Sequence, residues 1–424
     1  MSSSRGEFRI ATVLVTAVAV VTCAVCVSPG AVAHVLEDAA RRLRSLSVNK
    51  QKRKSVRVYM DGCFDLAHFG HANALRQAKA CGDVLVVGLV PDAEVLRCKG
   101  PPVLREAERR AVIESVKWVD EIIENVPYDL TPEFCNTLYR KHGIDFIVHG
   151  DDPCLLPDGT DAYDSPKKQG KFKMIKRTEG VSTTAIVDAI LYAARFGEKE
   201  NKSDENASTT QELTQEVTAK PSSENRFLTT TRRVTQFSGG GKAVPENAHV
   251  VYVHGAFDLF NAGHVHLLEK AKAFGDYLLV GIWDDADVRS QEGEGHPVLK
   301  CQERALGVLA CRHVDDIILG APTRVTKDLL ATFDVKVVVA EAMEGSIEKD
   351  AVDDPNKVAK NMGIFRTVEA PEAGSAGALT PSEIIKRVDE NRAAYESRNE
   401  RKNKSEAKYY AQKAERTIEV ARET

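Results

Sequence analysis

Two histidines three residues apart, His68 and His71, are the residues whose type and spacing most clearly indicate a chemical role for this chain. They end the stretch Asp61-Gly-Cys-Phe-Asp-Leu-Ala-His-Phe-Gly-His71. Residues 56–60 before it are rich in β-branched and aromatic side chains, and residues 72–80 after it are rich in alanine and leucine, which predicts a strand, a tight loop and a helix. At the start of a helix both imidazoles can face one side and donate hydrogen bonds to one phosphate group.

Two glycines add a second reason to expect a phosphate in this loop. Gly62 and Gly70 let the backbone approach an anion closely, and the helix that follows offers unpaired N–H groups and the positive end of its dipole. The order of strand, Gly-x-Phe-Asp and His-x-Gly-His resembles the signature of the nucleotidyltransferase superfamily. The resemblance implies that Gly62, Phe64, Asp65 and Gly70 contact the nucleotide.

A second stretch, Arg177-Thr-Glu-Gly-Val-Ser-Thr-Thr184, offers another anion site. It supplies one guanidinium group, a turn at Gly180 and three hydroxyl groups ahead of a helix predicted over 185–196. The hydroxyl groups can also cap that helix, because capping and phosphate binding use the same geometry. The stretch resembles the Arg-Thr-x-Gly-Ile-Ser-Thr signature of the cytidylyltransferases that make CDP-alcohols.

Length and composition limit the number of domains, the class of partner and the cellular compartment. The chain has 424 residues, is 43% hydrophobic and carries a formal net charge of −4. It is long enough for two or three cores, and its charge argues against a nucleic-acid partner. Its nine cysteines lack a paired zinc spacing, which favours a reducing compartment over a disulfide scaffold.

The N-terminal region contains an uncharged apolar run, residues 10–27, at the lower edge of the length that spans a bilayer. Basic residues crowd the far side of this run, at 41–54, and the positive-inside bias then keeps the body of the chain in the cytoplasm. We expect a hydrophobic helix that anchors cytoplasmic catalytic domains in the endoplasmic reticulum or mitochondrial outer membrane. A cleaved organelle-targeting peptide is the alternative.

The sequence contains an internal repeat, in which residues 251–264 match residues 58–71. Each copy alternates strands with helices, which predicts an α/β fold of two tandem Rossmann-like nucleotidyltransferase domains with parallel sheets. The expected organisation is a membrane anchor and basic flank at 1–55, a catalytic domain at 56–197, a flexible linker at 198–248, a degenerate second domain at 249–380 and a charged, solvated helix at 381–424.

The two copies differ at positions that would face the triphosphate. His68 becomes Asn261, Lys99 has a glutamate as its counterpart, and the stretch 374–380 lacks the arginine of the first copy. We therefore expect catalysis in the first copy and a structural or regulatory role for the second. Residual nucleotide binding by the second copy stays open.

The resemblance to cytidylyltransferases implies a mechanism. A phosphomonoester oxygen attacks the α-phosphorus of CTP in line and pyrophosphate leaves, so the protein positions groups and neutralises charge. His68 and His71 would donate to the α-phosphate, and Lys99 would bridge it to the incoming phosphate. The β and γ phosphates would be held by Arg177, Ser182, Thr183 and Thr184. Arg109 matches a Glu-Arg of the family and would contact CTP, with a solvated helix cation as the alternative.

Magnesium is the expected cofactor, since a cation that bridges pyrophosphate oxygens helps this group to leave. No carboxylate cluster dedicated to a metal is visible in the sequence. The ion is therefore expected to arrive with CTP, without protein ligands of its own.

Two short motifs indicate which alcohol phosphate is the second substrate. Asn125-Val-Pro-Tyr-Asp129 has tyrosine where choline enzymes of the family show tryptophan, and Tyr128 or Asp129 could accept a hydrogen bond from a primary ammonium. The motif His149-Gly-Asp-Asp-Pro153, with His149 and Asp151, is similar to that of the ethanolamine enzymes.

Residues 56–395, including the duplication, thus resemble the ethanolamine-phosphate cytidylyltransferases. This resemblance implies the substrates CTP and phosphoethanolamine and the product CDP-ethanolamine, which is used in the synthesis of phosphatidylethanolamine. Alternatives are a choline-phosphate or glycerol-3-phosphate cytidylyltransferase, an adenylyltransferase of the superfamily, and a membrane-anchored nucleotide-binding pseudoenzyme. A homodimer stays open.

Overall fold

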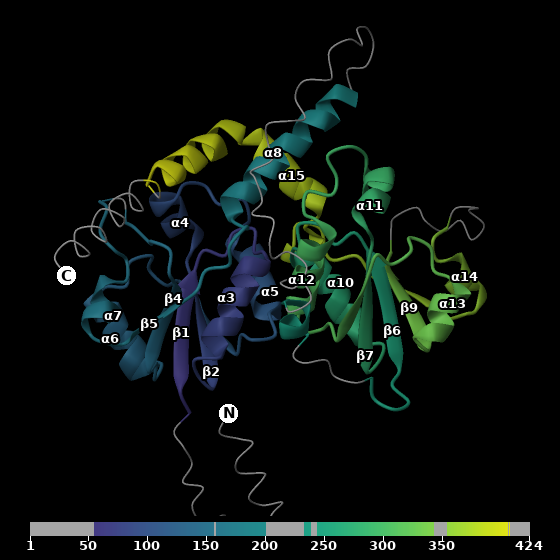
Figure 1. Ribbon diagram of the computed structural model, residues 1–424, viewed down its shortest axis with the longest axis horizontal. Helices are drawn as coiled ribbons and strands as arrows, with labels where there is room; N and C mark the ends of the chain where they lie inside the picture. Colours follow the sequence, from purple (N-terminus) through teal and green to yellow (C-terminus); the bar gives the residue numbers. More distant parts are fainter. Residues whose placement is uncertain are drawn as a thin grey trace, which may run out of the picture. The chain divides into compact units, whose positions relative to one another are not determined.

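Each copy of the repeat folds around its own parallel sheet, as expected for this α/β pattern. The structure, a computed structural model, describes residues 55–156, 158–200, 233–238, 244–342, 354–405 and 407. Within them lie two five-stranded sheets, with strand orders β3-β2-β1-β4-β5 and β10-β9-β6-β7-β8 (Figure 1). All the pairings between these strands are parallel.

In the first half the strands alternate with helices along the chain. The elements are β1 (Arg57–Gly62), α3 (Phe69–Lys79), β2 (Val84–Leu89), α4 (Asp92–Cys98), α5 (Glu106–Ser115), β3 (Glu121–Ile123), α6 (Pro132–Lys141), β4 (Phe146–Gly150), α7 (Asp164–Lys168), β5 (Phe172–Ile175) and α8 (Thr183–Glu200). The strand order changes direction beside β1, where β1 lies between β2 and β4. Ligands of open α/β sheets bind outside the carboxyl ends of the strands at such a point.

The second half repeats this arrangement. Its elements are β6 (Val250–Gly255), α10 (Ala262–Lys272), β7 (Tyr277–Ile282), α11 (Asp285–Glu292), α12 (Cys301–Ala310), β8 (Asp316–Leu319), α13 (Lys327–Thr332), β9 (Val335–Glu341), α14 (Lys357–Asn361), β10 (Phe365–Val368), the 3₁₀ turn η2 (Ala376–Ala378) and α15 (Pro381–Glu390). The repeat seen in the sequence is therefore a repeat of the fold.

The central strands are buried on both faces, which explains their unbroken apolar sequences. β2 and β7 read VLVVGL and YLLVGI. Their glycines are required by packing, since a methyl group on Gly88 would lie 2.0 Å from the hydroxyl oxygen of Tyr59, and one on Gly281 2.2 Å from that of Tyr252. The same close contact was thus kept in both copies.

The loop after the first strand of each half has an unusual backbone. Phe64 and Leu66 have φ angles of 50° and 47°, and the equivalent Phe257 and Leu259 have 51° and 45°. Non-glycine residues in this left-handed region cost about 1–3 kcal/mol each. This turn places the next residues, among them His68, at the N-terminus of the following helix.

The halves meet along the ends of α5 and α12, where they exchange backbone hydrogen bonds. The N–H of Lys117 donates to the carbonyl of Ala310 at 2.9 Å, and the N–H of Arg312 donates to that of Ser115 at 2.7 Å. Ser115 and Lys117 occupy the places in the first copy that Ala310 and Arg312 occupy in the second. The contact is therefore reciprocal, as in a symmetric dimer.

An ion pair links the first half to α15. Arg387 donates through Nη1 and Nη2 to the carboxylate of Glu108, at 2.7 and 3.1 Å. The Glu108 side chain is fully buried and also accepts from the backbone N–H of Arg105 at 2.8 Å. Burial alone would raise the pKa of Glu108, but the hydrogen bonds from Arg387 and Arg105 outweigh it, so this pKa is lowered.

Part of the predicted linker packs on the first half. Residues 233–238 lie within it, and Phe237 is fully buried, with its ring centroid 5.2 Å from that of Trp118. Arg233 places its guanidinium 5.7 Å from the centre of the Phe69 ring. The structure does not describe residues 201–232, so flexibility there stays a prediction.

The C-terminal region differs from the solvated helix that its charge predicted. Ile384 and Val388 of α15 are fully buried, and the helical residues that follow, 392–405, include the buried Tyr395 and Asn399. The apolar stripe of this region therefore packs against the rest of the chain, because the two halves offer it an apolar surface at their junction.

The localisation expected from the sequence is corrected. Within the part of the chain that the structure describes, no helix is long and apolar enough to cross a membrane. The apolar run 10–27, on which the expected hydrophobic helix rested, lies outside the described residues. The membrane-anchored placement is therefore withdrawn.

The ion pair across the junction gives a stability prediction. Arg387→Ala removes two hydrogen bonds from the buried Glu108 carboxylate, and we expect the free energy of unfolding to fall by about 2 kcal/mol at neutral pH. Denaturant unfolding measures this loss. A carboxyl group whose pKa is lower in the folded state stabilises the fold at pH values above its pKa in the unfolded chain, and this stabilisation is lost as pH falls. The difference in free energy of unfolding between the variant and the unsubstituted chain should therefore shrink below about pH 4.

Lys386→Ala is the matched control for this experiment. Its side chain is 65% exposed and pairs with Glu390 at 3.9 Å, so it should change the free energy of unfolding by less than about 0.5 kcal/mol. Equal losses from the two variants would show that the pair with Glu108 does not tie α15 to the first half.

Candidate functional site

A cleft of about 610 Å³ opens at the carboxyl ends of the strands in the first half. It gathers most of the residues predicted from the sequence. They are Gly62, Phe64, Asp65, His68, Gly70, His71, Lys99, Tyr128, His149, Arg177, Ser182, Thr183 and Thr184. Arg109, Asp129, Asp151 and Gly180 are predicted residues that do not line this cleft.

The two histidines are held by the first turn of α3. Nδ1 of His68 accepts a hydrogen bond from the backbone N–H of Gly70 at 3.1 Å. Nδ1 of His71 accepts one from the backbone N–H of His68 at 3.3 Å, which completes a capping box. The ring centroids lie 4.1 Å apart, close enough for both rings to contact one phosphate group.

These hydrogen bonds decide which nitrogen of each ring carries the proton. Since a backbone N–H only donates, each Nδ1 must be an acceptor, and a neutral ring then keeps its proton on Nε2. Burial, with the charges of Lys99 and Lys402, lowers the pKa of His71 to about 3. Burial also lowers the pKa of His68, with His71 and Arg177 adding to the effect. Both rings are therefore neutral Nε2–H donors near pH 7.

Gly70 and Phe64 shape the space around these rings. A methyl group on Gly70 would lie 2.8 Å from the His68 ring and from the Val181 side chain, so only glycine fits there. The Phe64 ring packs edge-on against His71 at 5.7 Å between centroids. Close packing thus fixes the histidine rotamers as well as their tautomers.

The loop from Arg177 to Thr184 forms the opposite wall of the cleft. Its hydroxyl groups have structural partners, as Ser182 Oγ accepts from the backbone N–H of Ala185 at 3.1 Å, and Thr183 Oγ1 donates to the carbonyl of Asp65 at 3.2 Å. Arg177 Nη1 lies 3.9 Å from a carboxylate oxygen of Asp152. The loop therefore caps α8, ties to the histidine loop and places one guanidinium group in the cleft.

Lys99 and Tyr128 lie together on the remaining side. Lys99 follows the last residue of α4 and places Nζ 5.4 Å from the centre of the Tyr128 ring. The pKa of Lys99 is raised, first by the neighbouring Cys63 thiol, and also by Tyr128 and Cys154 against the opposing effect of burial. Lys99 is therefore a fixed positive charge inside the cleft.

The cleft also contains a buried carboxylate that was not among the residues predicted from the sequence. Asp61 lines the cleft and is 6% exposed, and its Oδ1 accepts from the hydroxyl of Tyr163 at 3.1 Å. Burial raises the pKa of Asp61 to about 7, although Tyr163 and Lys99 lower it in part. The Tyr163 ring in turn packs against His149 at 4.3 Å between centroids. A signal was present, since the repeat places His254 where the first copy has Asp61.

Arg109 is a correction to the sequence analysis, which assigned it to CTP. Its side chain is fully buried and donates to the carbonyl of Val90 at 2.9 Å and to that of Cys63 at 2.6 Å, with an ion pair to Asp92. Arg304 makes the equivalent pair with Asp285 in the second half. Both arginines therefore hold the loops around each site, away from its surface.

Three further predicted residues also lie outside the cleft lining. Asp151 accepts from the backbone N–H of Arg177 at 2.8 Å and so positions that loop. Gly180 has a φ angle of 81° and forms its turn. Asp129 lies next to Tyr128, and burial raises the pKa of its carboxyl group.

Asp65 lines the cleft, yet its carboxylate has structural partners. It accepts from the backbone N–H of Leu104 at 3.0 Å and from that of Val103 at 3.1 and 3.0 Å. Arg398 from the C-terminal region approaches the same carboxylate at 3.3 Å. Asp65 therefore ties the histidine loop to the segment after Lys99.

The second half keeps the same capped helix after its first strand, but the side chains around it differ. Asn261 caps α10 as His68 caps α3, with its Oδ1 accepting from Gly263 N–H at 2.9 Å, but its amide Nδ2 donates to the carbonyl of Leu259 at 3.1 Å. His254 accepts from Trp283 Nε1 at 3.1 Å. The donor that would face a phosphate is thus turned inward, and an indole lies beside the strand end.

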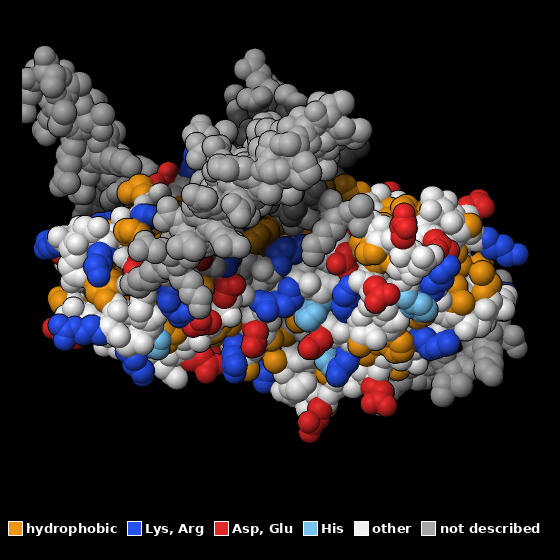
Figure 2. Space-filling model, turned by 90° about the horizontal axis from the view of Figure 1, so that it is seen from below, with side chains coloured by type: hydrophobic (Ala, Val, Ile, Leu, Met, Phe, Trp, Pro, Cys, Tyr) orange, Lys and Arg blue, Asp and Glu red, His pale blue; other side chains and the backbone are white. Residues whose placement is uncertain are grey.

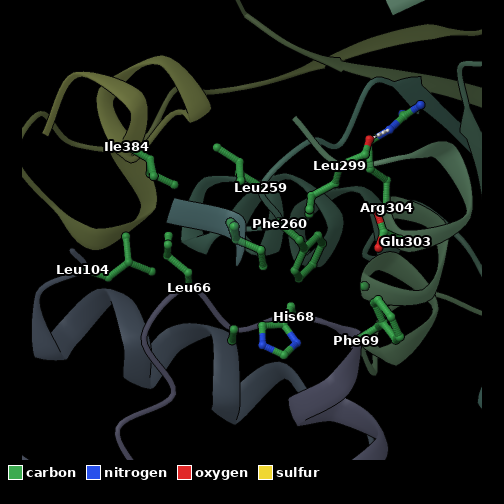
Figure 3. Close-up of a pocket in the computed structure, with 13 residues that line it drawn as sticks. Leu66, His68, Phe69, Leu104, Leu259, Phe260, Leu299, Glu303, Arg304 and Ile384 are labelled. Atoms are coloured by element: carbon green, nitrogen blue, oxygen red, sulfur yellow. Dashed lines mark hydrogen bonds between the residues drawn. The ribbon is translucent and has the colours of Figure 1, made fainter. Parts of the chain in front are cut away.

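A small cavity lies between the loop that carries His68 and the equivalent loop of the second half. Figure 3 shows Leu66, His68 and Phe69 of the first half facing Leu259 and Phe260 of the second. The cavity is about 20 Å³, room for about one water molecule. The back of the loop that carries His68 therefore rests on the second half.

The charges on the surface do not by themselves predict an anionic partner. On the face seen in Figure 2, Lys and Arg side chains alternate with Asp and Glu side chains. Among the described residues, no group of three or more His, Cys, Asp or Glu side chains is arranged to hold a metal ion. The face seen in Figure 2 therefore offers no patch of a single charge sign.

Comparison with known proteins agrees with this geometry. The sequence matches the family described as cytidylyltransferase-like over residues 59–189 and 252–367, one match for each half. It is 46% identical over 375 residues to an ethanolamine-phosphate cytidylyltransferase of Arabidopsis thaliana, covering 86% of this chain and 87% of that protein.

Two further relatives match very different shares of the chain. An ethanolamine-phosphate cytidylyltransferase of Dictyostelium discoideum is 44% identical over 363 residues, with 85% of this chain and 98% of that protein covered. A probable choline-phosphate cytidylyltransferase of Schizosaccharomyces pombe is 45% identical, but over 140 residues, 32% of this chain and 38% of that protein.

The hydrogen bonds of the histidines predict how they titrate. With ring-labelled histidine, NMR should show His68 and His71 as neutral Nε2–H tautomers from about pH 8 to about pH 5, where an unperturbed histidine would gain a proton. Asparagine substitutions at each position assign the signals. Titration of either ring near pH 6.5 would contradict the assignment of both as neutral donors.

Proposed function

The chain belongs to the family of the ethanolamine-phosphate cytidylyltransferases, and we propose from this premise that its first half carries the reaction. The reaction transfers the cytidylyl group of CTP to phosphoethanolamine and yields CDP-ethanolamine and pyrophosphate. The observation that carries the proposal is the pair of neutral Nε2–H donors, His68 and His71, in one cleft with Lys99 and Arg177.

The histidines act at the α-phosphate. As the phosphoethanolamine oxygen bonds to the α-phosphorus and the bond to the β-phosphate bridge breaks, negative charge grows on the oxygens around phosphorus. Nε2–H of His68 and of His71 donate to these oxygens. Since the rings are fixed before the substrate arrives, they need no reorganisation during the reaction.

The two cationic walls separate the substrates. Arg177, near the helix N-terminus of α8, binds the β and γ phosphates and helps the departing pyrophosphate. Lys99, on the other wall, holds the incoming phosphomonoester against the α-phosphate and screens the repulsion between these anions. The attack is thereby arranged in line.

Magnesium enters this proposal with the nucleotide. The cleft offers the carboxylates of Asp61 and Asp152, which are placed beside Tyr163 and Arg177 respectively, so the donor set fits an ion held mainly by phosphate oxygens. When bound, Mg²⁺ would neutralise charge on the leaving pyrophosphate.

The ammonium group of the second substrate is proposed to lie near Asp61. This carboxylate is buried and has a pKa of about 7, so a bound cation would favour its charged form. Tyr128 and Tyr163 provide the surrounding aromatic side chains and hydroxyl groups. A primary ammonium can donate hydrogen bonds to such groups, whereas a trimethylammonium cannot.

A comparison of substrates tests the proposal. The full chain with CTP and Mg²⁺ is offered phosphoethanolamine, phosphocholine and glycerol-3-phosphate, and pyrophosphate release is measured. We expect the highest kcat/KM for phosphoethanolamine. Release that is highest with either other substrate would assign a different alcohol, and no release with any would refute the transfer reaction.

Asp61→Asn adds a test of the ammonium site within the same assay. The amide keeps the acceptor for Tyr163 but loses the charge, so KM for phosphoethanolamine should rise about tenfold while KM for CTP stays unchanged. In the unsubstituted chain, KM for phosphoethanolamine should rise as pH falls below about 7, because Asp61 is charged above its pKa. The variant should show a smaller rise, because only protonation of the substrate phosphate, whose second pKa is about 6, then remains.

The two halves give a second prediction. His71→Ala removes a donor to the transition state and should lower kcat by about 100-fold or more, whereas His264→Ala should retain most of the turnover. His264→Gln keeps an acceptor for the capping N–H of Asn261 and guards against loss of folding. Comparable losses at both positions would overturn the single-site proposal.

A further inference from the structure

Cationic residues from the end of the chain line the cleft of the first half. Arg398, Arg401, Lys402 and Ser405 belong to the helical residues 392–405, which follow α15. In Figure 1 this yellow ribbon runs from the second half toward α4. The segment that the sequence predicted to be solvated thus forms part of the site.

The spacing of these residues places them on one side of the helix. Positions 398, 401, 402 and 405 are three or four residues apart and share a face. Lys404 lies off this face; its side chain is 80% exposed and pairs with Glu400 at 3.7 Å, and it does not line the cleft. The helix therefore turns Arg398, Arg401 and Lys402 toward the cleft, but not Lys404.

Partly buried hydrogen bonds fix the helix in this position. Tyr395 Oη donates to the carbonyl of Pro102 at 3.2 Å, and Arg398 Nη1 donates to that of Pro101 at 3.0 Å. On the other side Asn399, 5% exposed, donates to Asp188 of α8 at 2.8 Å. The helix thus bridges the loop after Lys99 and the helix after the Arg177 loop, the two walls of the cleft.

Arg401 and Lys402 are then placed where a nucleotide would carry charge. A methyl group on Gly100 would lie 3.5 Å from Nη2 of Arg401, which puts this guanidinium group beside the Lys99 loop. The charge of Lys402 contributes to lowering the pKa of both His68 and His71. Both side chains are exposed at the rim of the cleft, where an anion can reach them.

We infer that Arg401 and Lys402, carried by the helix that follows α15, bind the phosphate groups of CTP in the cleft of the first half. The inference rests on the proposed function and names further binding residues for it. The polyphosphate is the part of the two substrates with the highest charge density, and long cationic side chains at a rim can close on it. The second half thereby contributes to catalysis without a working site of its own.

The test compares point variants of the full chain. Arg401→Ala and Lys402→Ala should each raise KM for CTP about tenfold, the loss expected for a charge-assisted hydrogen bond to phosphate. KM for phosphoethanolamine should stay unchanged, and inhibition by product pyrophosphate should weaken in parallel. Lys402→Arg should restore most of the affinity.

Matched controls separate this role from a structural one. Lys404→Ala removes the same charge from a neighbouring position that does not line the cleft, and it should leave KM for CTP unchanged. All of these side chains are exposed, so the thermal unfolding midpoint should not move. Added salt should raise KM for CTP less in the double variant Arg401→Ala/Lys402→Ala than in the unsubstituted chain, because fewer exposed charges remain to be screened.

Three outcomes would overturn the inference. They are an unchanged KM for CTP in both variants, equal increases in KM for both substrates, and a gain in turnover, which would mean that the helix obstructs the cleft. Calorimetric titration with CTP and with pyrophosphate separates this inference from the proposed function. If the unsubstituted chain binds CTP without turnover, the transfer reaction fails, while weaker binding by the variants would still support the phosphate contacts.

Discussion

The hydrogen bonds between two histidine rings and the backbone of one helical turn are the contacts on which the site depends. They satisfy N–H groups that a helix N-terminus leaves unpaired, and they fix the tautomer of both rings. Burial keeps the rings neutral. Nδ1 of each ring thus serves the helix cap, and Nε2–H is left for the phosphate contact proposed above.

This arrangement requires a strained loop and a rigid surround. Phe64 and Leu66 adopt left-handed backbone angles, and the buried carboxylate of Asp65 and the buried guanidinium of Arg109 hold the loop on either side. The second half keeps this framework, through Asp258 and Arg304, although its cleft residues have changed. Framework and chemistry are therefore carried by different residues of the same motif.

The duplicated half serves the site through its packing. It joins the first half by reciprocal backbone hydrogen bonds and supports the back of the His68 loop (Figure 3). It also carries the chain back to the first cleft, because α15 is tied to α5 by the pair of Arg387 with Glu108. Loss of its own donor at Asn261 is compatible with a role that depends only on shape.

Local sequence determined the strand, loop and helix around His68, the repeat and the Arg177 loop, because these depend on patterns within about fifteen residues. It also shows that only the first copy has both histidines, together with Lys99 and Arg177. Tertiary structure alone decided that Arg109 is buried and Asp61 faces the cleft, since the sequence shows a charge but not its partners. It likewise decided that Arg401 and Lys402 reach the first cleft, because contacts between residues some 300 positions apart depend on how the two halves pack.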